Sequence, residues 1–360
     1  MAVEVSAREL LRLREFTQRI RPAAEGTVAE TVRHLVALQA QDFANAVWAV
    51  GLRTAGSTRS AVLAALERGE VVRTLPMRGT LHFVAAEDLR WMLDLTAART
   101  LQSAKTRFEN LGLDATTLAR SESIVTSALA GASMSRDEFM KLLAGNGIAP
   151  DGQRGYHVIF YLAQRGVVCW GPPSGTQQAL VLVDDWIPAA RPPLARDAAL
   201  AQFALRYFAG HGPATERDFA WWTKLTLADV RAAITDCGDA LTELSHAGET
   251  YRIATNELDA ASTVHATAAV HALPGFDEYL LGYQDRLLPL AAEHSQRIVP
   301  GNNGIFLPTI VAGGRVVGTW RRTPKSKAHA IEPLHFGQAS AAAQSGFLRA
   351  ALRYARFSSG

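Results

Sequence analysis

The sequence predicts an α+β fold: three tandem winged helix-turn-helix domains followed by a C-terminal β domain with a closing helix. Three observations lead to this prediction. A helix-like run, a glycine and two strand-like runs follow one another at three places in the chain. Short helices with capping signals precede these units, and the pattern changes after about residue 260. A chain of 360 residues is also long for a single hydrophobic core.

The repeated unit ends each of its helices at a glycine. Gly69, Gly166 and Gly238 each follow a helical run, where a left-handed residue would stop the helix. Turn residues then separate two β-rich runs, which is the pattern of a two-stranded wing. The units cover residues 59–84, 155–183 and 227–253, with turns expected at Pro76 to Gly79, Pro172 to Gly175, and Ala247-Gly248.

Capping signals mark helices upstream of the second and third units. Ser135 is followed three residues later by Glu138, and Thr215 by Asp218, which is the spacing of a capping box. The run that begins at Thr215, "TERDFAWWTKLTLADVRAAI", predicts two helices joined at a tight corner.

The last hundred residues predict a small β domain. Strand-like runs from Ile305 to Val311 and from Arg315 to Trp320 flank a Gly313-Gly314 turn, and "SAAAQSGFLRAALRYARF" closes the chain as a helix. A proline-rich stretch, residues 184–198, predicts a linker. The predicted domains therefore cover residues 1–95, 96–190, 191–258 and 259–360.

Composition and charge narrow the class of protein. No run approaches the length of about 20 apolar residues that a membrane span needs, and the first residues do not have the pattern of a signal peptide. The two cysteines, Cys169 and Cys237, do not form a disulfide framework, so we expect a reducing, cytoplasmic location. The formal net charge of +3 decides little, but two basic stretches contain almost no acid, as in a nucleic-acid-binding surface. Their basic residues are Arg73 and Arg78 in the first, and Arg315, Arg321, Arg322, Lys325 and Lys327 in the second.

Common catalytic and metal-binding motifs are absent from the sequence. His-Glu-x-x-His, paired Cys-x-x-Cys, Walker glycines and Gly-x-Ser-x-Gly do not occur. The ten histidines are scattered, and no lysine lies in an apolar setting where a lowered pKa would make it a nucleophile. The adjacent carboxylates Asp277 and Glu278 point to opposite faces if the segment is extended, so we expect a structural role for them.

One polar segment interrupts an apolar helical run. Val32, Leu35, Val36 and Leu38 form an apolar stripe at helical spacing, and the polar residues Gln39, Gln41, Asp42 and Asn45 follow it. Residues two positions apart lie about 200° apart on a helix but on the same side of an extended segment. The two glutamines can therefore act on one group only if the helix ends or distorts near Leu38; otherwise they are surface helix residues.

Five segments together resemble the AlkZ-like DNA glycosylases. They occur in the expected order over nearly the full length of the chain: "LQAQD", "ANAVWAVGLRT", "RTLPMRGTLHFV", "LPGFDEYLLGYQDR" and "GNNGIFLPTIVAGGRVVGTWRR". The resemblance implies three tandem winged helices with a C-terminal β domain, and a Gln-Φ-Gln catalytic motif in which Φ is nonpolar. Gln39, Ala40 and Gln41 match that motif. A related branch of the family has Asp in place of the second Gln. This chain has Gln there, which makes it similar to the branch of antibiotic self-resistance enzymes.

The resemblance also implies partners and site residues. The substrate would be double-stranded DNA with alkylated purines, acted on by a monomer that needs no cofactor, metal or obligate protein partner. Asp42 either orients the glutamines or a water, or caps the next helix, and Asn45 is a second accessory candidate. We expect Trp48 to lie in the core. The candidates for contact with DNA phosphates are Arg73, Arg78, Arg315, Arg321, Arg322 and Lys325.

Two functions from different classes follow. The leading one is a monofunctional DNA glycosylase that removes bulky N7-alkylguanine adducts or crosslinks. It would give self-resistance to an organism that makes a genotoxic natural product. The alternative is a non-enzymatic winged-helix regulator or drug sensor. Recognition of paired half-sites usually needs a dimerisation helix, and the absence of such a helix or of heptads favours the enzyme.

Overall fold

The structure is a computed structural model that describes residues 3–174, 177–187, 194–263, 269–323 and 331–360. By its internal contacts the chain divides into two compact units, residues 1–63 with 200–360 and residues 64–199. The first unit is therefore built from both ends of the chain. The combination of helices and sheets confirms the α+β class, and the division into four domains stays a prediction.

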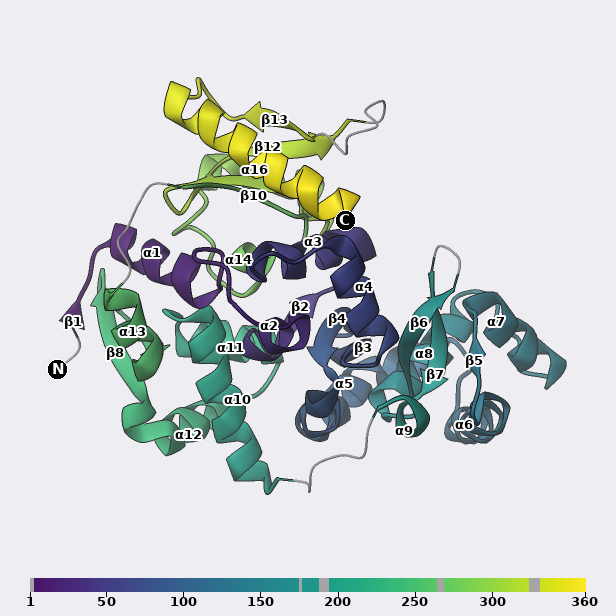
Figure 1. The fold of residues 1–360 in the computed structure, drawn as a ribbon. Helices are drawn as coiled ribbons and strands as arrows, with labels where there is room; N and C mark the ends of the chain where they lie inside the picture. Colours follow the sequence, from purple (N-terminus) through teal and green to yellow (C-terminus); the bar gives the residue numbers. More distant parts are fainter. Residues whose placement is uncertain (1–2, 175–176, 188–193, 264–268, 324–330) are drawn as a thin grey trace. The chain divides into compact units, whose positions relative to one another are not determined.

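The unit formed by residues 64–199 contains one antiparallel sheet with the strand order β4-β3-β6-β7-β5 and a set of helices (Figure 1). Its core joins apolar side chains of α5, α6, α7 and α8 to those of β6 and β7. Its elements are β3 (Val71–Met77), β4 (Thr80–Ala85), η1 (Ala86–Asp88), α5 (Leu89–Asn110), α6 (Ala115–Leu129), β5 (Ser133–Met134), α7 (Arg136–Gly145), α8 (Arg154–Gln164), β6 (Val168–Ser174), β7 (Gln177–Leu182) and α9 (Val183–Trp186). Two helices cross the unit boundaries, α4 (Arg59–Glu67) and α10 (Arg196–His211).

The other unit contains two sheets, β1-β8-β9 and the antiparallel β10-β11-β12-β13. Helix α16 packs on β10 and β13 and crosses this second sheet (Figure 1). The helices are α1 (Ala7–Thr17), α2 (Val28–His34), α3 (Phe43–Arg53), α11 (Glu216–Thr223), α12 (Leu227–Cys237), η2 (Gly238–Ala240), α13 (Thr255–Ser262), α14 (Glu278–Leu281), η3 (Ala292–His294), α15 (Ser295–Ile298), η4 (Pro300–Asn302) and α16 (Ala341–Ser359). The strands are β1 (Val3–Glu4), β2 (Ala37–Gln39), β8 (Leu241–His246), β9 (Glu249–Ala254), β10 (Val270–Leu273), β11 (Thr309–Ala312), β12 (Arg315–Arg322) and β13 (Ile331–His335).

The structure confirms the helix–glycine–hairpin pattern at all three predicted places. Gly69, Gly166 and Gly238 have φ values of +67°, +69° and +49°, and an antiparallel strand pair follows each of them. Both predicted capping boxes are present, at α7 and α11. The run from Thr215 forms two helices, as expected, because Lys224 adopts a left-handed conformation between them.

Some predicted boundaries were wrong. The strand expected from Ile305 begins only at Thr309, because the preceding chain reverses at Gly301, Asn302 and Gly304, which adopt left-handed conformations. Pro76 lies inside β3, so the first turn contains only Arg78 and Gly79. The expected linker is helical at both ends, in α9 and α10, and its residues 188–193 lie outside the described residues.

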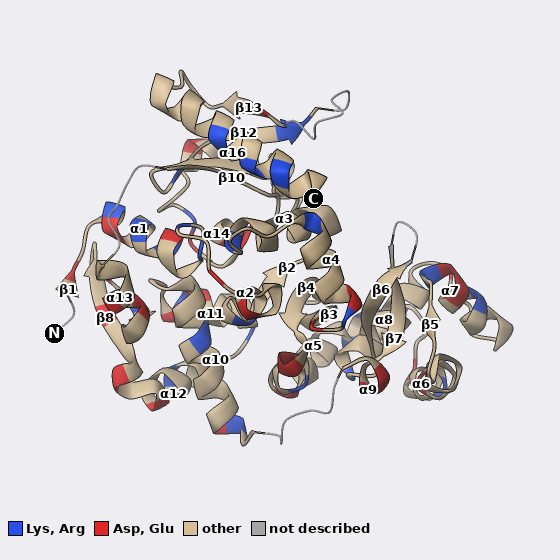
Figure 2. Ribbon diagram, in the orientation of Figure 1, with Lys and Arg blue, Asp and Glu red and all other residues tan. Residues whose placement is uncertain are grey.

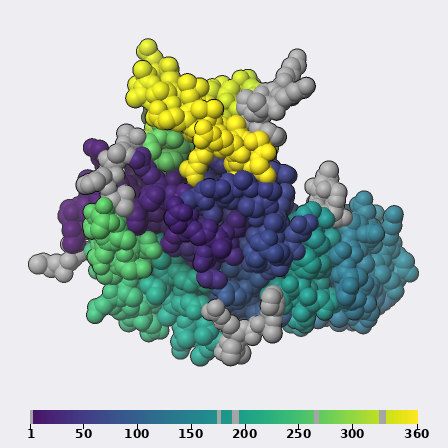
Figure 3. Space-filling model, viewed as in Figure 1, coloured from purple at the N-terminus to yellow at the C-terminus, as the bar shows by residue number. Residues whose placement is uncertain are grey.

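Helix α3 is tied to the C-terminal part of its own unit. The buried Arg53 guanidinium donates to both carboxylate oxygens of Asp277 at 2.7 and 2.9 Å. Trp48 is 1% exposed, as expected for the core, and its ring lies 5.2 Å from Tyr354 and 5.0 Å from Phe357 on α16. The space-filling view shows α16 (yellow) against the N-terminal residues (purple) (Figure 3). These contacts fix the position of the segment that precedes α3.

Candidate functional site

Helix α2 ends before the glutamine pair. Thr27 begins the helix with a capping box to Glu30, and the helical residues stop at His34. Val36 then takes a left-handed conformation, with φ of +63°, which is uncommon for a β-branched residue. Strand β2 follows at once, so Val36 and Leu38 leave the helix although both stay buried. The helix thus ends before Leu38, and the helical arrangement that would place the two glutamines on opposite sides is absent.

Gln39 and Gln41 lie on either side of a buried residue. Ala40 is fully buried, Gln39 is half-buried and Gln41 is exposed, and β2 ends at Gln39, so that Gln41 lies in the bend that follows. Both glutamines thus face away from the core at the end of β2.

Asp42 begins helix α3. Its Oδ1 accepts a hydrogen bond from the backbone N–H of Asn45 at 2.9 Å, so it acts as the N-cap. The side-chain amide nitrogen of Asn45 lies near Gly275, 2.9 Å from the place where a Cβ atom on that glycine would be. Gln39, Gln41, Asp42 and Asn45 thus lie along the short stretch of chain from the end of β2 to the first turn of α3.

A buried carboxylate supports the glutamine segment from behind. Glu278 is 1% exposed, and its Oε1 accepts a hydrogen bond from the backbone N–H of Gln39 at 3.0 Å. Its Oε2 accepts from the indole Nε1–H of Trp222 at 2.9 Å and lies 3.4 Å from Nε2 of His211. Each oxygen of the carboxylate thus accepts a hydrogen bond, and one of the two donors is the motif itself.

The chain around Glu278 is rigidly held. Asp277 caps α14 by accepting from the backbone N–H of Tyr279 at 2.9 Å, while it also binds Arg53. Phe276 has a φ of +60°, a strained conformation for a side chain of this size. The ion pair and the cap hold this conformation, and so fix the direction in which Glu278 points.

Two histidines and a glutamate in the same unit, all largely shielded from solvent, are among the groups with shifted pKa values. Burial, reinforced by the Arg19 guanidinium, lowers the pKa of His34 to about 3. Burial also lowers the pKa of His271 to about 3, with Arg353 nearby. Burial raises the pKa of Glu15, whose carboxylate lies 3.8 Å from His271, to about 7. His34 and His271 are therefore neutral near pH 7.

The predicted basic residues are spread over both units. Figure 2 shows Lys and Arg (blue) on elements of both units. Arg315 begins β12, and Arg321 and Arg322 end it, so these positions lie at opposite ends of a strand. Arg321 pairs with Glu332, and the Arg322 guanidinium lies 5.9 Å from the Tyr354 ring centroid. Arg73 and Arg78 belong to the strand and turn of the β3–β4 hairpin, where Arg78 contacts His82 at 2.8 Å. Lys325 and Lys327 lie outside the described residues.

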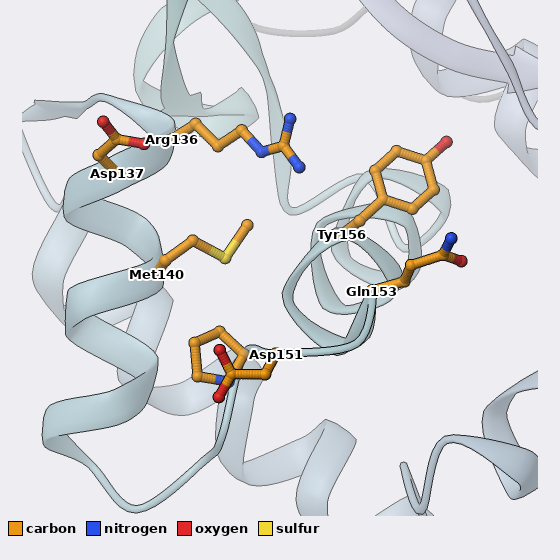
Figure 4. A pocket seen from close by; sticks show the side chains of 7 residues that line it. Arg136, Asp137, Met140, Asp151, Gln153 and Tyr156 are labelled. Atoms are coloured by element: carbon orange, nitrogen blue, oxygen red, sulfur yellow. The ribbon is translucent and has the colours of Figure 1, made fainter.

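A pocket with an accessible volume of about 600 Å³ lies elsewhere, in the unit formed by residues 64–199. Side chains of α7 and α8 and of the segment between them surround it (Figure 4). None of its lining residues is a site residue that the sequence predicts; they are Arg136, Asp137, Met140, Pro150, Asp151, Gln153 and Tyr156.

The described ranges offer neither a metal centre nor a membrane span. Within them, no group of three or more His, Cys, Asp or Glu side chains is arranged to hold a metal ion. None of the helices in that part of the chain combines the length and the apolar character that crossing a membrane requires.

Sequence reasoning missed Glu278, Trp222 and His211. Glu278 lies within the segment "LPGFDEYLLGYQDR", but its adjacent pair with Asp277 indicated only a structural role. Contacts over 239 positions leave no periodic signal in a single sequence, so local pattern could not connect this residue to Gln39.

Comparisons with known proteins agree over most of the chain. Residues 32–357 match the family model described as "DNA glycosylase AlkZ-like". An "Interstrand DNA cross-link repair glycosylase" of Streptomyces sahachiroi is 29% identical over 335 residues, which is 88% of each chain. The solved structure of "Streptomyces sahachiroi DNA glycosylase AlkZ" superposes with a TM-score of 0.85 at 25% identity, covering 99% of this chain and 98% of the other.

Proposed function

Because the chain belongs to the AlkZ-like DNA glycosylase family, we propose that Gln39 and Gln41 are its catalytic residues and that it hydrolyses the N-glycosidic bond of N7-alkylguanine. Family membership makes the protein a DNA glycosylase and confirms the resemblance noted in the sequence. The alternative of a non-enzymatic regulator loses its support.

The chemistry of the substrate suits a neutral amide pair. Alkylation at N7 gives guanine a positive charge, and the electron pair of the breaking C1′–N9 bond neutralises it. Departure of such a base needs no strong acid. The sugar acquires oxocarbenium character, and a water oxygen forms the new bond to C1′ while its proton passes to solvent.

The glutamine oxygens supply the interactions that this reaction needs. A side-chain amide oxygen accepts a hydrogen bond from the attacking water, or lies near the positive charge that develops on the sugar. Such groups help most when they are held in place before the reaction, because they then need no reorganisation in the transition state.

One observation carries the assignment. Gln39 at the end of β2 and Gln41 in the bend after it flank the buried Ala40, and both are more exposed than Ala40. The hydrogen bond from the backbone N–H of Gln39 to Glu278 supports a fixed position for this segment. In this proposal Asp42 and Asn45 shape the start of α3 beside the reacting sugar, Asp42 through its cap.

The cognate lesion extends the proposal. The relative from Streptomyces sahachiroi is named for repair of interstrand crosslinks, and the two chains match over 88% of their lengths. We infer that this protein also processes bulky N7 adducts or crosslinks, and that it protects its producer from a genotoxic natural product. No lysine of the described residues is enclosed in an apolar setting, since Lys105, Lys141 and Lys224 are all exposed. This supports a monofunctional enzyme without a strand-nicking lyase step.

Mass spectrometry of released bases tests the function. DNA treated with alkylators, from simple methylating agents to bifunctional natural products, is incubated with the protein under single-turnover conditions. N7-alkylguanine and the similarly cationic N3-alkyladenine should be released. Uracil, 8-oxoguanine and 1,N6-ethenoadenine should stay near background, because a positioned acid that would add about 10²–10⁴-fold is not part of the proposed mechanism. Efficient uracil release, or a steep rise in rate toward acid pH, would contradict this mechanism.

A further inference from the structure

The segment from Pro300 to Phe306 is a loop that begins with η4 and is held by hydrogen bonds of Gln296 and Asn303. Gly301, Asn302 and Gly304 have φ values of +64°, +53° and +77°, so the chain reverses sharply. Gln296 supports this path: its Oε1 accepts from the backbone N–H of Gly301 at 3.1 Å, and its Nε2 donates to Oδ1 of Asn302 at 3.2 Å. Ile305, whose backbone N–H donates to Oδ1 of Asn303 at 2.9 Å, follows directly.

This fixed loop presents an apolar side chain to solvent. Ile305 is 52% exposed, whereas its neighbours Phe306 and Leu307 are half-buried. Leaving a large aliphatic side chain in water forgoes the stabilisation that its burial would give. Exposure alone does not distinguish Ile305 from other exposed apolar residues such as Leu287 and Leu352; its fixed loop and the position of that loop do.

The loop adjoins the glutamine segment. The carbonyl oxygen of Phe306 lies 2.7 Å, and the side-chain nitrogen of Asn45 2.9 Å, from the position that a Cβ atom on Gly275 would occupy. Asn45 belongs to the first turn of α3, which begins just after Gln41. Ile305 thus precedes a residue whose backbone lies beside the first turn after the proposed catalytic motif.

A cation and two aromatic rings back the loop. The Arg286 guanidinium lies 5.1 Å from the Phe306 ring centroid and 4.9 Å from that of Trp221. Its Nε donates to the carbonyl oxygen of Leu280 at 2.9 Å, which fixes the guanidinium. The Phe306 ring also lies 6.3 Å from the ring of Phe276. These contacts hold Phe306, the residue next to Ile305, in place, so we expect the loop to keep its conformation when it contacts DNA.

The charge of the surrounding sequence favours a polyanion as the occupant. Between Glu293 and Glu332 the chain contains no acidic residue and six Arg or Lys residues. An apolar side chain set in an acid-poor, basic stretch is the combination by which proteins insert wedges between DNA bases.

We propose that Ile305 is an apolar wedge that inserts into the base stack of DNA beside the lesion. The wedge parts two neighbouring bases and bends the helix axis, which opens the sugar of the alkylated nucleotide to the water at Gln39 and Gln41. The lesion is thereby reached while the adduct stays outside any enclosing pocket. This inference rests on the proposed function, because it places the wedge relative to the glutamine pair.

The test is the fluorescence of 2-aminopurine placed next to N7-methylguanine in a duplex. Stacking quenches this base, so saturating wild-type protein should raise its fluorescence several-fold on binding, before any base is released. Ile305→Ala and Ile305→Asn should lose most of this rise and lower the single-turnover rate about 10-fold or more. Ile305→Leu should keep both, and Leu352→Ala is the control, since Leu352 is a comparable side chain, 58% exposed, on α16.

The outcomes separate this inference from the function. If wild type releases the base and Ile305→Ala matches it in fluorescence and rate, the wedge is wrong and the glycosylase assignment stands. If wild type releases nothing, the proposed substrate is wrong, while the fluorescence change on binding still tests the wedge. Equal loss in Leu352→Ala would show a general effect of surface change and would also overturn the wedge. Thermal melting of each variant confirms that it is folded.

Discussion

Oε1 of Glu278 accepts a hydrogen bond at 3.0 Å from the backbone N–H of Gln39, a residue 239 positions earlier in the chain. This contact joins the end of β2 to α14, where Arg53 and Asp277 form a buried ion pair. The position of the proposed catalytic motif therefore depends on residues near the C-terminal end of the chain.

Replacement of either motif glutamine should slow base release and leave DNA binding intact. Gln39→Ala and Gln41→Ala each remove one preorganised polar interaction, which typically costs about 10²–10³ in rate. Single-turnover release of N7-methylguanine and the equilibrium Kd for the same duplex measure the two effects. Gln102→Ala, at an exposed position on α5, is the control. Wild-type rates in both motif variants would refute the catalytic assignment.

Glu278 should act as a positioning residue. In Glu278→Gln the amide retains one acceptor oxygen, so either the hydrogen bond from the Gln39 backbone or the one from the Trp222 indole is lost. We expect the free energy of unfolding to fall by about 1–3 kcal/mol. Displacement of the motif should lower kcat by about 10²-fold while the Kd for DNA stays the same.

Two further variants make the Glu278 test specific. Glu278→Ala, which lacks any acceptor, should be slower than Glu278→Gln, and Glu293→Gln, whose side chain is 78% exposed, should match wild type. A loss of stability with no change in kcat would mean that Glu278 is purely structural.

Asp42 can be tested for the two roles that the sequence leaves open. If it acts as a cap, Asp42→Asn should keep both stability and rate, because Asn caps helices as well as Asp does. Asp42→Ala should lower the free energy of unfolding by about 0.5–2 kcal/mol. Asp114 caps α6 in the same way, accepting from the backbone N–H of Thr117 at 2.7 Å, so Asp114→Ala controls for the removal of a cap. A slow Asp42→Asn variant with normal stability would instead show that the carboxylate orients a glutamine or water.

Removal of basic residues should weaken binding to every DNA sequence alike. Arg78→Ala, and the double variant of Arg321→Ala with Arg322→Ala, should each lower the slope of log K against log salt by about 0.9 for every phosphate that is no longer neutralised. Arg231→Ala is a matched control for Arg321, because each is an exposed arginine paired with one glutamate. A weakening confined to one DNA sequence would show that these residues read bases.

The pKa of His34 predicts how stability depends on pH. Its value of about 3 in the folded protein lies below the ordinary 6.5, so the unfolded chain binds a proton that the folded one does not. The contribution of His34 to stability is therefore present above pH 6.5 and is lost as the pH falls toward 3. His34→Gln should remove about 1.4 kcal/mol per pH unit from the slope of unfolding free energy between pH 6 and 4.

Denaturant unfolding at several pH values measures this slope. Glu15, whose pKa is raised to about 7, has the opposite sign: its contribution is present at low pH and is lost as the pH rises from about 4.5 to 7. The wild type and the His34→Gln variant both contain Glu15, so its effect on the slope cancels when the two slopes are compared. An unchanged slope in His34→Gln would show that His34 is protonated in the folded protein.

Local features of the fold could be predicted because their causes are local. Gly69 stops a helix, Ser135 and Glu138 cap one another, and each hairpin pairs neighbouring strands, all within short stretches of sequence. From the sequence we could say only that the helix must end near Leu38 if the two glutamines are to act together. The left-handed conformation of Val36, which follows the end of α2, has no sequence signal. The false strand at Ile305 arose because apolar residues of a surface loop have the same pattern as a buried strand.

The candidate site residues likewise divide into those that a local sequence pattern indicates and those that only a long-range contact reveals. Gln39 and Gln41 could be found because two amides after an apolar run are unusual and resemble a family motif. Glu278 could not be assigned to the site, because its role depends on a contact that only the folded chain makes.

The chain order of the two units has a consequence for biosynthesis. Gln39 leaves the ribosome early, and at about 5–20 residues per second the 239 positions that separate it from Glu278 take about 10–50 s to translate. Residues 64–199 emerge entirely within that interval and have their own core. A nascent or truncated chain that stops before Glu278 therefore carries both glutamines without the carboxylate that fixes them. If Glu278 positions the glutamines as proposed, we expect a chain that ends before it to be unable to excise bases.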